Sequence, residues 1–413
     1  MRILSGQNAV RTVEMLSSRG TNFTAIEPRV RAIINDVRRN GDRALRRYAE
    51  RWDDLAKNHP LQVSEAEMAA ALKALPSDTR KSLRQAAQSI RHFCEWQKPR
   101  GWTRKRGGVS LGQMAIPLDS VGCYVPGGRY PLVSTLLMVV IPAQVAAVEN
   151  IRVVSPKPST EVLAAAGMLG VREFYRVGGA QAIAALAYGT KTVQRVDKIV
   201  GPGNAYVTTA KKLVSFDCSI DFLAGPTEAV VLSESGNPKF IAADLVSQAE
   251  HDPDALSIFI TTNQKLAEAV ALSMDEAARD NPIARKSLQR QGVILLATSR
   301  EKVRDWANAL APEHITIARE DLRYIRNAGS IFVGDYSPQA AGDYASGPNH
   351  VLPTSGQARF RGGLSVLDFI KLITVQELTR NGLKQKRRTV ETLAQVEGLR
   401  AHAASVSVRY AHD

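Results

Sequence analysis

Histidines with acidic or amide neighbours mark the segments of this chain that could perform chemistry. Of seven histidines in 413 residues, four are His251, His314, His350 and His402, and each has a carboxylate or amide side chain within a few positions. Imidazoles and carboxylates bind divalent metals and transfer protons near neutral pH. If these segments meet in the folded chain, they form a metal site beside an acid–base pair.

The segment Gln248-Ala-Glu-His251 ends a predicted helix that begins at Asn237-Pro238. Asparagine is a favourable N-cap, and proline suits the first helical position. Gln248 and His251 are three residues apart, so both project from one face at the helix C-terminus. Polar side chains that continue an apolar stripe need partners, and either a bound metal or a satisfied core pair would supply them.

The remaining candidates have two interpretations each when considered singly. Glu313-His314 leads into a predicted strand, where the pair could divide proton abstraction and water activation or simply end a loop. Gly342–His350 is a polar, glycine-rich loop that could bring its aspartate and histidine into one cavity or form a plain turn. His402 lies in the last helical stretch, where an isolated histidine is most often a surface residue.

Two glycine-rich turns stand where a predicted strand gives way to a helix. They are Pro126-Gly127-Gly128 and Gly201-Pro202-Gly203-Asn204. Exposed backbone N–H groups at such a turn suit a phosphate. Neither turn has the Gly-x-Gly-x-x-Gly pattern, because Tyr206 stands at the third glycine position. The ordinary dinucleotide fingerprint is therefore absent.

Residues 1 to about 110 have mainly helical periodicity, and strands alternate with helices from about residue 118. The predicted strands are 120–125, 151–154, 173–177, 198–200, 220–223, 229–232, 256–261, 293–297, 314–317 and 330–333. Such alternation is typical of parallel βαβ units. The sequence predicts an α/β fold with two Rossmann-like parallel-sheet domains that lack the usual glycine fingerprint, followed by a helical, basic C-terminal tail.

Composition is that of a folded globular protein, with 44% hydrophobic and 23% charged residues. The longest apolar run, 132–148, is too short and too interrupted to span a bilayer, and the N-terminus lacks the apolar core of a signal peptide. We expect a cytoplasmic location. Cys94, Cys123 and Cys218 are scattered and fit passive thiols in a reducing compartment.

The net charge is +14, and basic residues form two clusters, at 98–106 and 384–388. Such clusters can bind nucleic acid, but they can equally form a solvated face or attract an anionic cofactor. No nucleic-acid-binding motif accompanies them, and Trp102 is the one aromatic residue within them. Nucleic acid is therefore not the expected partner.

Seven segments, in this order, resemble the histidinol dehydrogenase family over almost the whole chain. They are Val121–Gly128, Val177–Ala182, Lys198–Tyr206, Asp221–Glu228, Ser247–Pro253, Ala311–His314 and Gly342–Pro353. The segments are long, and several are specific to that family. The resemblance implies a homodimeric enzyme that uses zinc and NAD to oxidise L-histidinol to L-histidine through an enzyme-held aldehyde, in two hydride transfers.

The resemblance also implies roles for individual residues. Zinc would be held by Gln248, His251, Asp343 and His402, with His402 supplied by the partner subunit of the homodimer. His314 would take the alcohol proton, and Glu313 would activate water. Positions near the substrate are Thr227, His350 and Glu397, together with the zinc ligands and His314. Positions that contact NAD are Tyr124, Gln181 and Asn204.

The expected organisation has four parts. Residues 1–20 form a helical arm, residues 21–120 and 227–363 form a first α/β domain with the zinc and catalytic residues, residues 121–226 form a second α/β domain that contacts NAD, and residues 364–413 form a helical tail that contacts the partner subunit.

Three segments depart from the family pattern. Thr227 stands where serine is usual, Met138–Pro142 lacks a common asparagine, and Arg359–Gly363 replaces a segment that usually carries serines. A relative that oxidises another amino alcohol or diol is therefore an alternative. The net charge of +14 motivates a second alternative, a non-catalytic relative that binds nucleic acid.

Overall fold

The computed structural model describes residues 1–20, 23–127 and 130–411. Gly128, the last residue of the first glycine-rich turn, lies outside the described residues. The chain divides into two compact units. Unit 1 contains Met1–Gln97 and Leu118–Phe369, and unit 2 contains Lys98–Pro117 and Ile370–Asp413.

The first sheet of unit 1, sheet A, has six parallel strands in the order β1-β12-β11-β10-β13-β14. Their bounds are β1 Arg2–Ser5, β10 Glu228–Leu232, β11 Leu256–Thr261, β12 Val293–Leu296, β13 His314–Ile317 and β14 Ser330–Val333. Apolar residues fill both faces, as expected for a parallel sheet covered by helices on each side.

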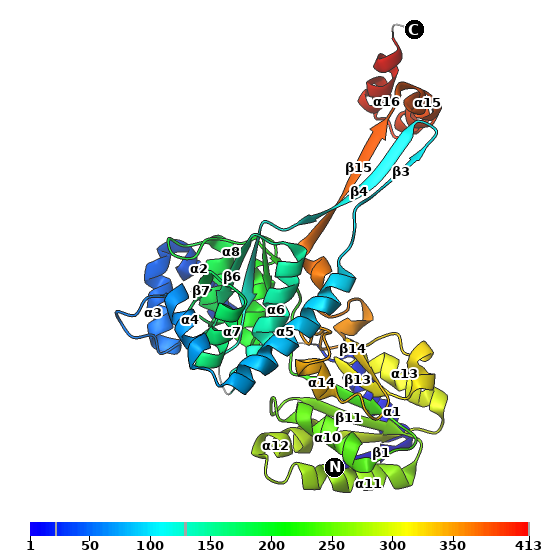
Figure 1. Cartoon of the computed structure of the whole chain (residues 1–413). Coiled ribbons are helices and arrows are strands. Elements are labelled where there is room, and N and C mark those ends of the chain that lie inside the picture. Colours follow the sequence, from blue (N-terminus) through cyan, green and yellow to red (C-terminus); the bar gives the residue numbers. More distant parts are fainter. Residues whose placement is uncertain (21–22, 128–129, 412–413) are drawn as a thin grey trace. The chain divides into compact units, whose positions relative to one another are not determined.

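Helices cover sheet A on both faces (Figure 1). One face packs against α1 Gly6–Ser17 and α13 Arg300–Leu310. The other packs against α10 Pro238–Ala249, α11 Gln264–Ala277 and α12 Pro282–Gln291. Unit 1 also contains the short elements η1 Arg319–Tyr324, α14 Gln339–Tyr344, η2 Gln357–Arg359 and η3 Val366–Phe369, of which η3 packs against α5 Ser77–Gln97 and α6 Val133–Ala146.

The second sheet, sheet B, has the order β2-β7-β6-β5-β8-β9, with β2 antiparallel and the others parallel. Its strands are β2 Gln62–Val63, β5 Ser120–Tyr124, β6 Asn150–Val154, β7 Glu173–Tyr175, β8 Lys198–Val200 and β9 Ser219–Ile220. The chain order of the parallel strands reverses direction between β5 and β8. Such a switch point is where open α/β sheets bind ligands, beyond the carboxyl ends of the strands.

Eight helices accompany sheet B among the described residues. One core joins strand residues to α2 Glu27–Asn40, α3 Asp42–Trp52, α8 Gly179–Tyr188 and α9 Ala205–Val214. The others, α4 Glu65–Ala74, α5 Ser77–Gln97, α6 Val133–Ala146 and α7 Thr160–Met168, pack in the pairs α4–α7, α5–α6 and α6–α7. Helix α6 is buried along nearly its whole length and contains Pro142. The two parallel sheets confirm the predicted fold class.

Residues 21–120 were expected to share a domain with residues 227–363. Their first helices and strand instead pack with sheet B. Strand β2 pairs with β7 of sheet B, and α2 and α3 share their core with α8 and α9. Within residues 1–20, expected as a helical arm, Gly6–Ser17 is helical and Arg2–Ser5 forms a strand of sheet A. These partners are distant in the sequence, so local periodicity could not assign them.

Unit 2 contains a three-stranded antiparallel sheet that the sequence did not predict. Its order is β15-β4-β3, with β3 Trp102–Arg106, β4 Val109–Pro117 and β15 Ile370–Leu378. Gly107 and Gly108 both have positive φ, as the two central residues of a tight hairpin turn require. The helices α15 Arg380–Val396 and α16 Arg400–Ser407 and the turn η4 Val408–Tyr410 follow, so only the later part of the expected helical tail is helical.

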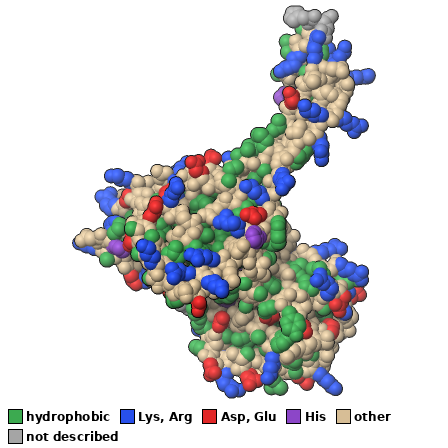
Figure 2. All heavy atoms as spheres, viewed as in Figure 1, with side chains coloured by type: hydrophobic (Ala, Val, Ile, Leu, Met, Phe, Trp, Pro, Cys, Tyr) green, Lys and Arg blue, Asp and Glu red, His purple; other side chains and the backbone are tan. Residues whose placement is uncertain are grey.

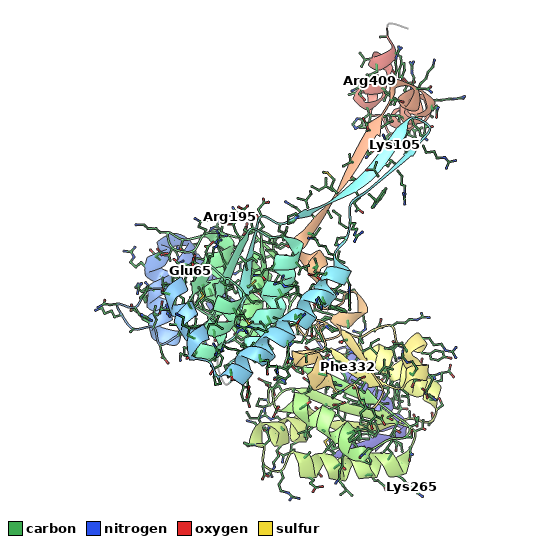
Figure 3. The ribbon with its side chains drawn as sticks, in the orientation of Figure 1. Glu65, Lys105, Arg195, Lys265, Phe332 and Arg409 are labelled. Carbon is green, nitrogen blue, oxygen red and sulfur yellow. The ribbon has the colours of Figure 1, made fainter. Side chains whose placement is uncertain are left out.

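The surface of unit 2 combines exposed apolar and basic side chains. Leu111, Met114, Leu372 and Ile373 on the sheet are each more than 40% exposed. In Figure 2 apolar side chains follow the strands, and basic side chains gather around the helical end. Lys105 and Arg409 are among the basic residues there (Figure 3).

Among the described residues, no helix is both long enough and apolar enough to cross a membrane. The three cysteines are buried and free. Burial raises the pKa of the Cys94 thiol to about 11 and that of Cys218 to about 12, so both thiols are protonated near neutral pH, as the sequence indicated.

Candidate functional site

The predicted acid–base and metal residues of unit 1 gather at the amino edge of sheet A. Glu313 and His314 stand at the start of β13, whose register pairs His314 with Ala229 near the start of β10. Helix α10 runs back from the carboxyl end of β10, which brings Gln248 near its C-terminus to the same edge. The residues therefore lie at the edge opposite to the one that α/β sheets usually use for ligands.

Helix α10 begins as the sequence predicted. The Asn237 side chain accepts a hydrogen bond from the Lys239 N–H at 3.0 Å, and Pro238 is the first helical residue. At the other end Gln248 is 2% exposed, and its Nε2 donates to Asp343 Oδ2 at 2.9 Å. Two residues 95 positions apart in the chain thus meet through a direct side-chain bond.

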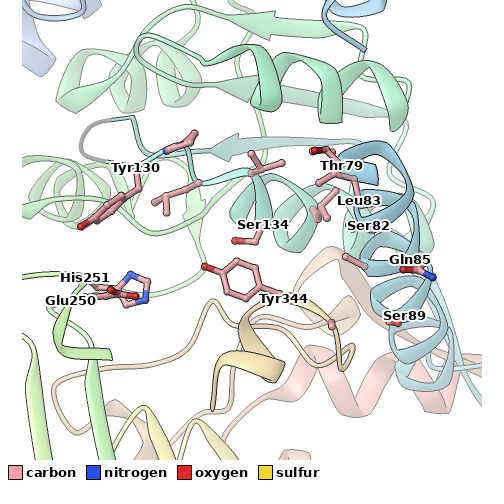
Figure 4. A pocket seen from close by; sticks show the side chains of 16 residues that line it. Thr79, Ser82, Leu83, Gln85, Ser89, Tyr130, Ser134, Glu250, His251 and Tyr344 are labelled. Atoms are coloured by element: carbon pink, nitrogen blue, oxygen red, sulfur yellow. The ribbon is translucent and has the colours of Figure 1, made fainter. Parts of the chain in front are cut away.

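His251 lies on the exposed side of this helix end, and it faces a cavity of about 650 Å³. Glu250, Tyr130, Ser134 and Tyr344 line the same cavity, and α5 closes it on one side (Figure 4). The expected common face for Gln248 and His251 is therefore divided: the amide is buried against Asp343, and the imidazole faces the cavity.

Glu313 and His314 are both buried, with 6% and 3% exposure. Glu313 Oε2 accepts a hydrogen bond from the Glu228 N–H at 3.0 Å and lies 3.7 Å from His314 Nδ1. His314 Nε2 lies 3.6 Å from Asp343 Oδ1. The imidazole is therefore flanked by a carboxylate on each side, at distances slightly longer than a hydrogen bond.

Burial gives these groups unusual proton affinities. Burial raises the pKa of Glu313 to about 8, although the charge of His314 and the Glu228 N–H oppose the shift. Burial alone would lower the pKa of His314, but the carboxylates of Glu313 and Asp343 outweigh it and raise that pKa. Burial alone would raise the pKa of Asp343, but the His314 imidazole outweighs it and lowers that pKa. Coupled groups of this kind suit proton transfer.

His350 is held at both ring nitrogens. Its Nδ1 lies 2.8 Å from the Asp343 carbonyl oxygen, and its Nε2 lies 3.3 Å from Thr135 Oγ1. Burial lowers the pKa of His350, so the ring is neutral at pH 7. His350 and His314 both line a second cavity, of about 400 Å³. Phe332 of β14, which is labelled in Figure 3, lines this cavity too. Its ring stacks on that of His314, with 6.0 Å between the ring centroids.

The donor set for a metal is assembled only in part within unit 1. Among the described residues, no group of three or more histidines, cysteines, aspartates and glutamates is arranged to hold an ion. Gln248 and Asp343 are in contact, and His251 follows Gln248 by less than one helical turn. His402 and Glu397 belong to unit 2, where both are exposed, on α16 and at the C-cap of α15. The four candidate ligands would supply an amide oxygen, two imidazole nitrogens and a carboxylate, and this donor set fits zinc chemically.

The three predicted NAD-contacting residues line a third cavity, of about 460 Å³. Tyr124 ends β5, Gln181 lies in the first turn of α8, and Asn204 caps α9. The cavity therefore lies at the carboxyl ends of β5 and β8, at the switch point of sheet B. Asp53 and Trp52, from the end of α3, also line it.

In the turn Gly201–Asn204 the Gly201 amide is already occupied, in contrast to the exposed amides we expected. Gly201 N–H donates to Asp221 Oδ2 at 2.8 Å, and the Asn204 side chain accepts from the first amides of α9. Lys211 forms an ion pair with Asp221 and donates to the Gly201 carbonyl at 2.9 Å. The Lys211 and Asp221 side chains are 2% and 1% exposed, so a buried ion pair fixes this turn.

Thr227 lies next to Glu228, whose N–H contacts Glu313. The Thr227 carbonyl accepts from the Leu256 N–H at 2.8 Å, and the residue is half-buried. The Glu228 side chain is held by Arg19, at 2.7 and 2.5 Å. Sequence reasoning missed both residues of this ion pair, because their partners are more than 200 positions apart.

Comparison with known proteins supports the resemblance over the whole length. The family model described as histidinol dehydrogenase matches residues 16–410. The histidinol dehydrogenase of Methanothermobacter thermautotrophicus is 49% identical over 389 residues, which cover 90% of this chain and 91% of that protein. That of Geobacter sulfurreducens is 44% identical, with 96% and 100% covered.

A solved structure gives the same result for the fold. The crystal structure of histidinol dehydrogenase from Elizabethkingia anophelis superimposes with a TM-score of 0.94 at 35% identity, covering 99% of this chain and 98% of that one. Both the sequence and the fold are thus shared over nearly the entire length. The chain belongs to the histidinol dehydrogenase family and is an oxidoreductase.

Proposed function

We propose that the protein oxidises L-histidinol to L-histidine with NAD and zinc, in two hydride transfers through an enzyme-held aldehyde, as a step of histidine biosynthesis. The observation that carries this proposal is the position of Asp343, which bonds to the Gln248 amide and lies 3.6 Å from the His314 imidazole. A candidate metal ligand and a candidate base thus share one carboxylate. Family membership supplies the substrate class.

The proposed zinc ligands are Gln248, His251, Asp343 and His402. The first three come from one subunit, and His402 comes from the partner subunit of a homodimer. The donor types favour zinc, and the direct contact between Gln248 and Asp343 supports a common site. When bound, zinc would hold the nitrogen atoms of the substrate and orient its carbinol carbon.

His314 acts as the base that accepts the proton of the alcohol. Its imidazole lines the cavity of about 400 Å³, so a substrate there can reach it. Glu313 acts on the second half of the reaction, where its carboxylate takes a proton from the water that adds to the aldehyde. The Glu228 N–H fixes one oxygen of Glu313 at 3.0 Å, which orients the carboxylate for this step.

The remaining substrate contacts are assigned to Thr227, His350 and Glu397. His350 is neutral and bonded at both nitrogens, which suits a positioning role better than proton transfer. NAD is assigned to the cavity with Tyr124, Gln181 and Asn204. Its place at the switch point of sheet B supports this assignment without the usual glycine fingerprint.

The decisive experiment measures NADH formation from L-histidinol by the purified full-length chain, with and without a chelator. We expect activity that the chelator removes and added zinc restores. The variant His314→Ala should keep its zinc and lose activity. Activity confined to another amino alcohol would favour the relative with a different substrate, and salt-sensitive DNA binding without any dehydrogenase activity would favour the non-catalytic relative.

A further inference from the structure

A buried carboxylate that the proposed reaction does not use stands in the wall of the third cavity. Asp53 ends helix α3 and is 8% exposed. Its Oδ2 accepts hydrogen bonds from the Gly178 N–H at 2.9 Å and from Gln181 Nε2 at 3.3 Å. Among the described residues, none donates a hydrogen bond to its Oδ1. One oxygen of Asp53 thus fixes the turn before α8, and the other is available to a ligand in the cavity that Asp53 lines.

Three backbone amides around this cavity already have protein acceptors. The Gly179 N–H donates to the Tyr124 hydroxyl at 3.1 Å. At the next helix, the Tyr206 and Val207 N–H groups donate to Asn204 Oδ1 at 3.0 and 3.2 Å. Helix N-termini bind phosphates through free N–H groups, and these N–H groups already have protein acceptors. These three amides are therefore not free for a phosphate, and the side chains that line the cavity contribute to recognition of the ligand.

The charge of the cavity wall also disfavours an additional phosphate. Of the described lining residues, Asp53 and Lys157 are the charged ones, and Lys157 pairs with Asp54 at 2.5 Å. A carboxylate accepts hydrogen bonds from neutral hydroxyls but repels a second anion. Trp52 lies beside Asp53, stacks on Tyr48 at 4.7 Å and is 43% exposed, so it offers an aromatic surface to a base.

We propose that Asp53 selects NAD over NADP. Its Oδ1 accepts a hydrogen bond from the 2′-hydroxyl of the adenosine ribose, and its charge excludes a 2′-phosphate. This inference rests on the proposed function, because it takes NAD to be the occupant of the cavity. In ordinary dinucleotide-binding folds an acidic residue about 20 positions after the glycine-rich turn contacts this hydroxyl. Here the acid comes from a helix that precedes every parallel strand of sheet B.

Three nucleotides test the two parts of the proposal, the hydrogen bond to the 2′-hydroxyl and the exclusion of a 2′-phosphate, independently. Binding of 5′-AMP, 2′-deoxy-5′-AMP and adenosine 2′,5′-bisphosphate to the full chain is measured by isothermal titration calorimetry. We expect the deoxy compound and the bisphosphate each to bind about 10-fold more weakly than 5′-AMP, because the first lacks the hydroxyl donor and the second brings a like charge. Equal binding of all three would overturn the proposal, whatever the variants do.

The variant Asp53→Asn keeps the shape of the side chain and an acceptor for the Gly178 N–H, but it removes the charge. The bisphosphate should then bind within about 3-fold of 5′-AMP, and the ratio of kcat/KM for NADP to that for NAD should rise about 10-fold. The matched control is Glu50→Gln, which removes one charge from the same helix at a residue that does not line the cavity. An unchanged ratio in folded Asp53→Asn, or an equal rise in the control, would refute the role of Asp53.

A failure of the proposed function would give a different binding result from a failure of the inference about Asp53. If neither 5′-AMP nor NAD binds to the wild-type chain, the cavity is not a nucleotide site and both proposals fall. If both bind without discrimination against the 2′-phosphate, the inference about Asp53 alone falls. Circular dichroism establishes whether each variant is folded, and the wild-type comparison of the three nucleotides remains decisive if Asp53→Asn is not.

Discussion

Replacing Asp244 by asparagine is expected to stabilise unit 1 at neutral pH. Asp244 lies on α10, half-buried, and its carboxylate accepts a hydrogen bond from the Gln339 backbone N–H. Burial raises the pKa of Asp244 from 3.8 to about 6, against the effect of that hydrogen bond. The folded state therefore holds this proton more tightly than the unfolded state does.

The sign of the effect follows from this difference. Below about pH 4 the group is protonated in both states and contributes no penalty. As the pH rises from about 4 to about 6, the unfolded state ionises first, and the folded state loses stability relative to it. Above about pH 6 the penalty is constant, at about 3 kcal/mol from the shift of about two pKa units. Relaxation around the carboxylate makes this figure an upper bound.

Urea denaturation at several pH values measures the effect. The difference in unfolding free energy between Asp244→Asn and wild type should be near zero at pH 4 and should reach about 1–3 kcal/mol in favour of the variant at pH 8. Asp305→Asn, an exposed aspartate on α13, is the matched control and should show no such trend. A difference that is independent of pH, or that grows towards acid pH, would refute the reasoning.

Three further predictions concern the ion pair and the proposed active site. The variant Lys211→Met leaves Asp221 buried without its cation, so it should lower the unfolding free energy by about 3–5 kcal/mol in urea titrations, and a loss below 1 kcal/mol would contradict the buried pair. His251→Ala should lose bound zinc in metal analysis while keeping its circular dichroism spectrum, and full zinc retention would remove this ligand from the proposed set. Mixing inactive His402→Ala with inactive His314→Ala should restore activity, because a mixed dimer has one intact site; no recovery after verified subunit exchange would exclude a shared site.

Most strands of the two parallel sheets could be predicted from short apolar runs, but β1 and β2 could not, because only one of their six residues is buried. Strands β11, β13 and β14 occupy the ranges expected from short apolar runs between turn signals. Strand β3 could not be predicted, because its five residues are all exposed and its sequence is Trp-Thr-Arg-Lys-Arg. Its place depends on β4, and β4 depends on β15, which lies more than 250 residues further along the chain.

In the candidate site, too, residues with a local sequence signal could be predicted, and contacts between distant segments could not. Residue type and the family resemblance identified Gln248, Asp343 and His314, which the structure brings together. Neither could identify Asp53 or Thr135, because their contacts with Gln181 and His350 join segments more than 120 residues apart. An aspartate at a helix end and a threonine inside an apolar helix carry no local signal of such a partner.

The pairing of β15 with β4 also constrains how the protein is made. Pro117 and Ile370 are register partners, although they are separated by roughly 250 residues. At a translation rate of 5–20 residues per second, β4 leaves the ribosome about 10–50 s before its partner exists. Throughout that interval the nascent hairpin of β3 and β4 has an open edge on β4, which is a template for pairing with other nascent chains. Synthesis rate and chaperone supply should therefore affect the yield of this protein more than the stability of its finished fold does.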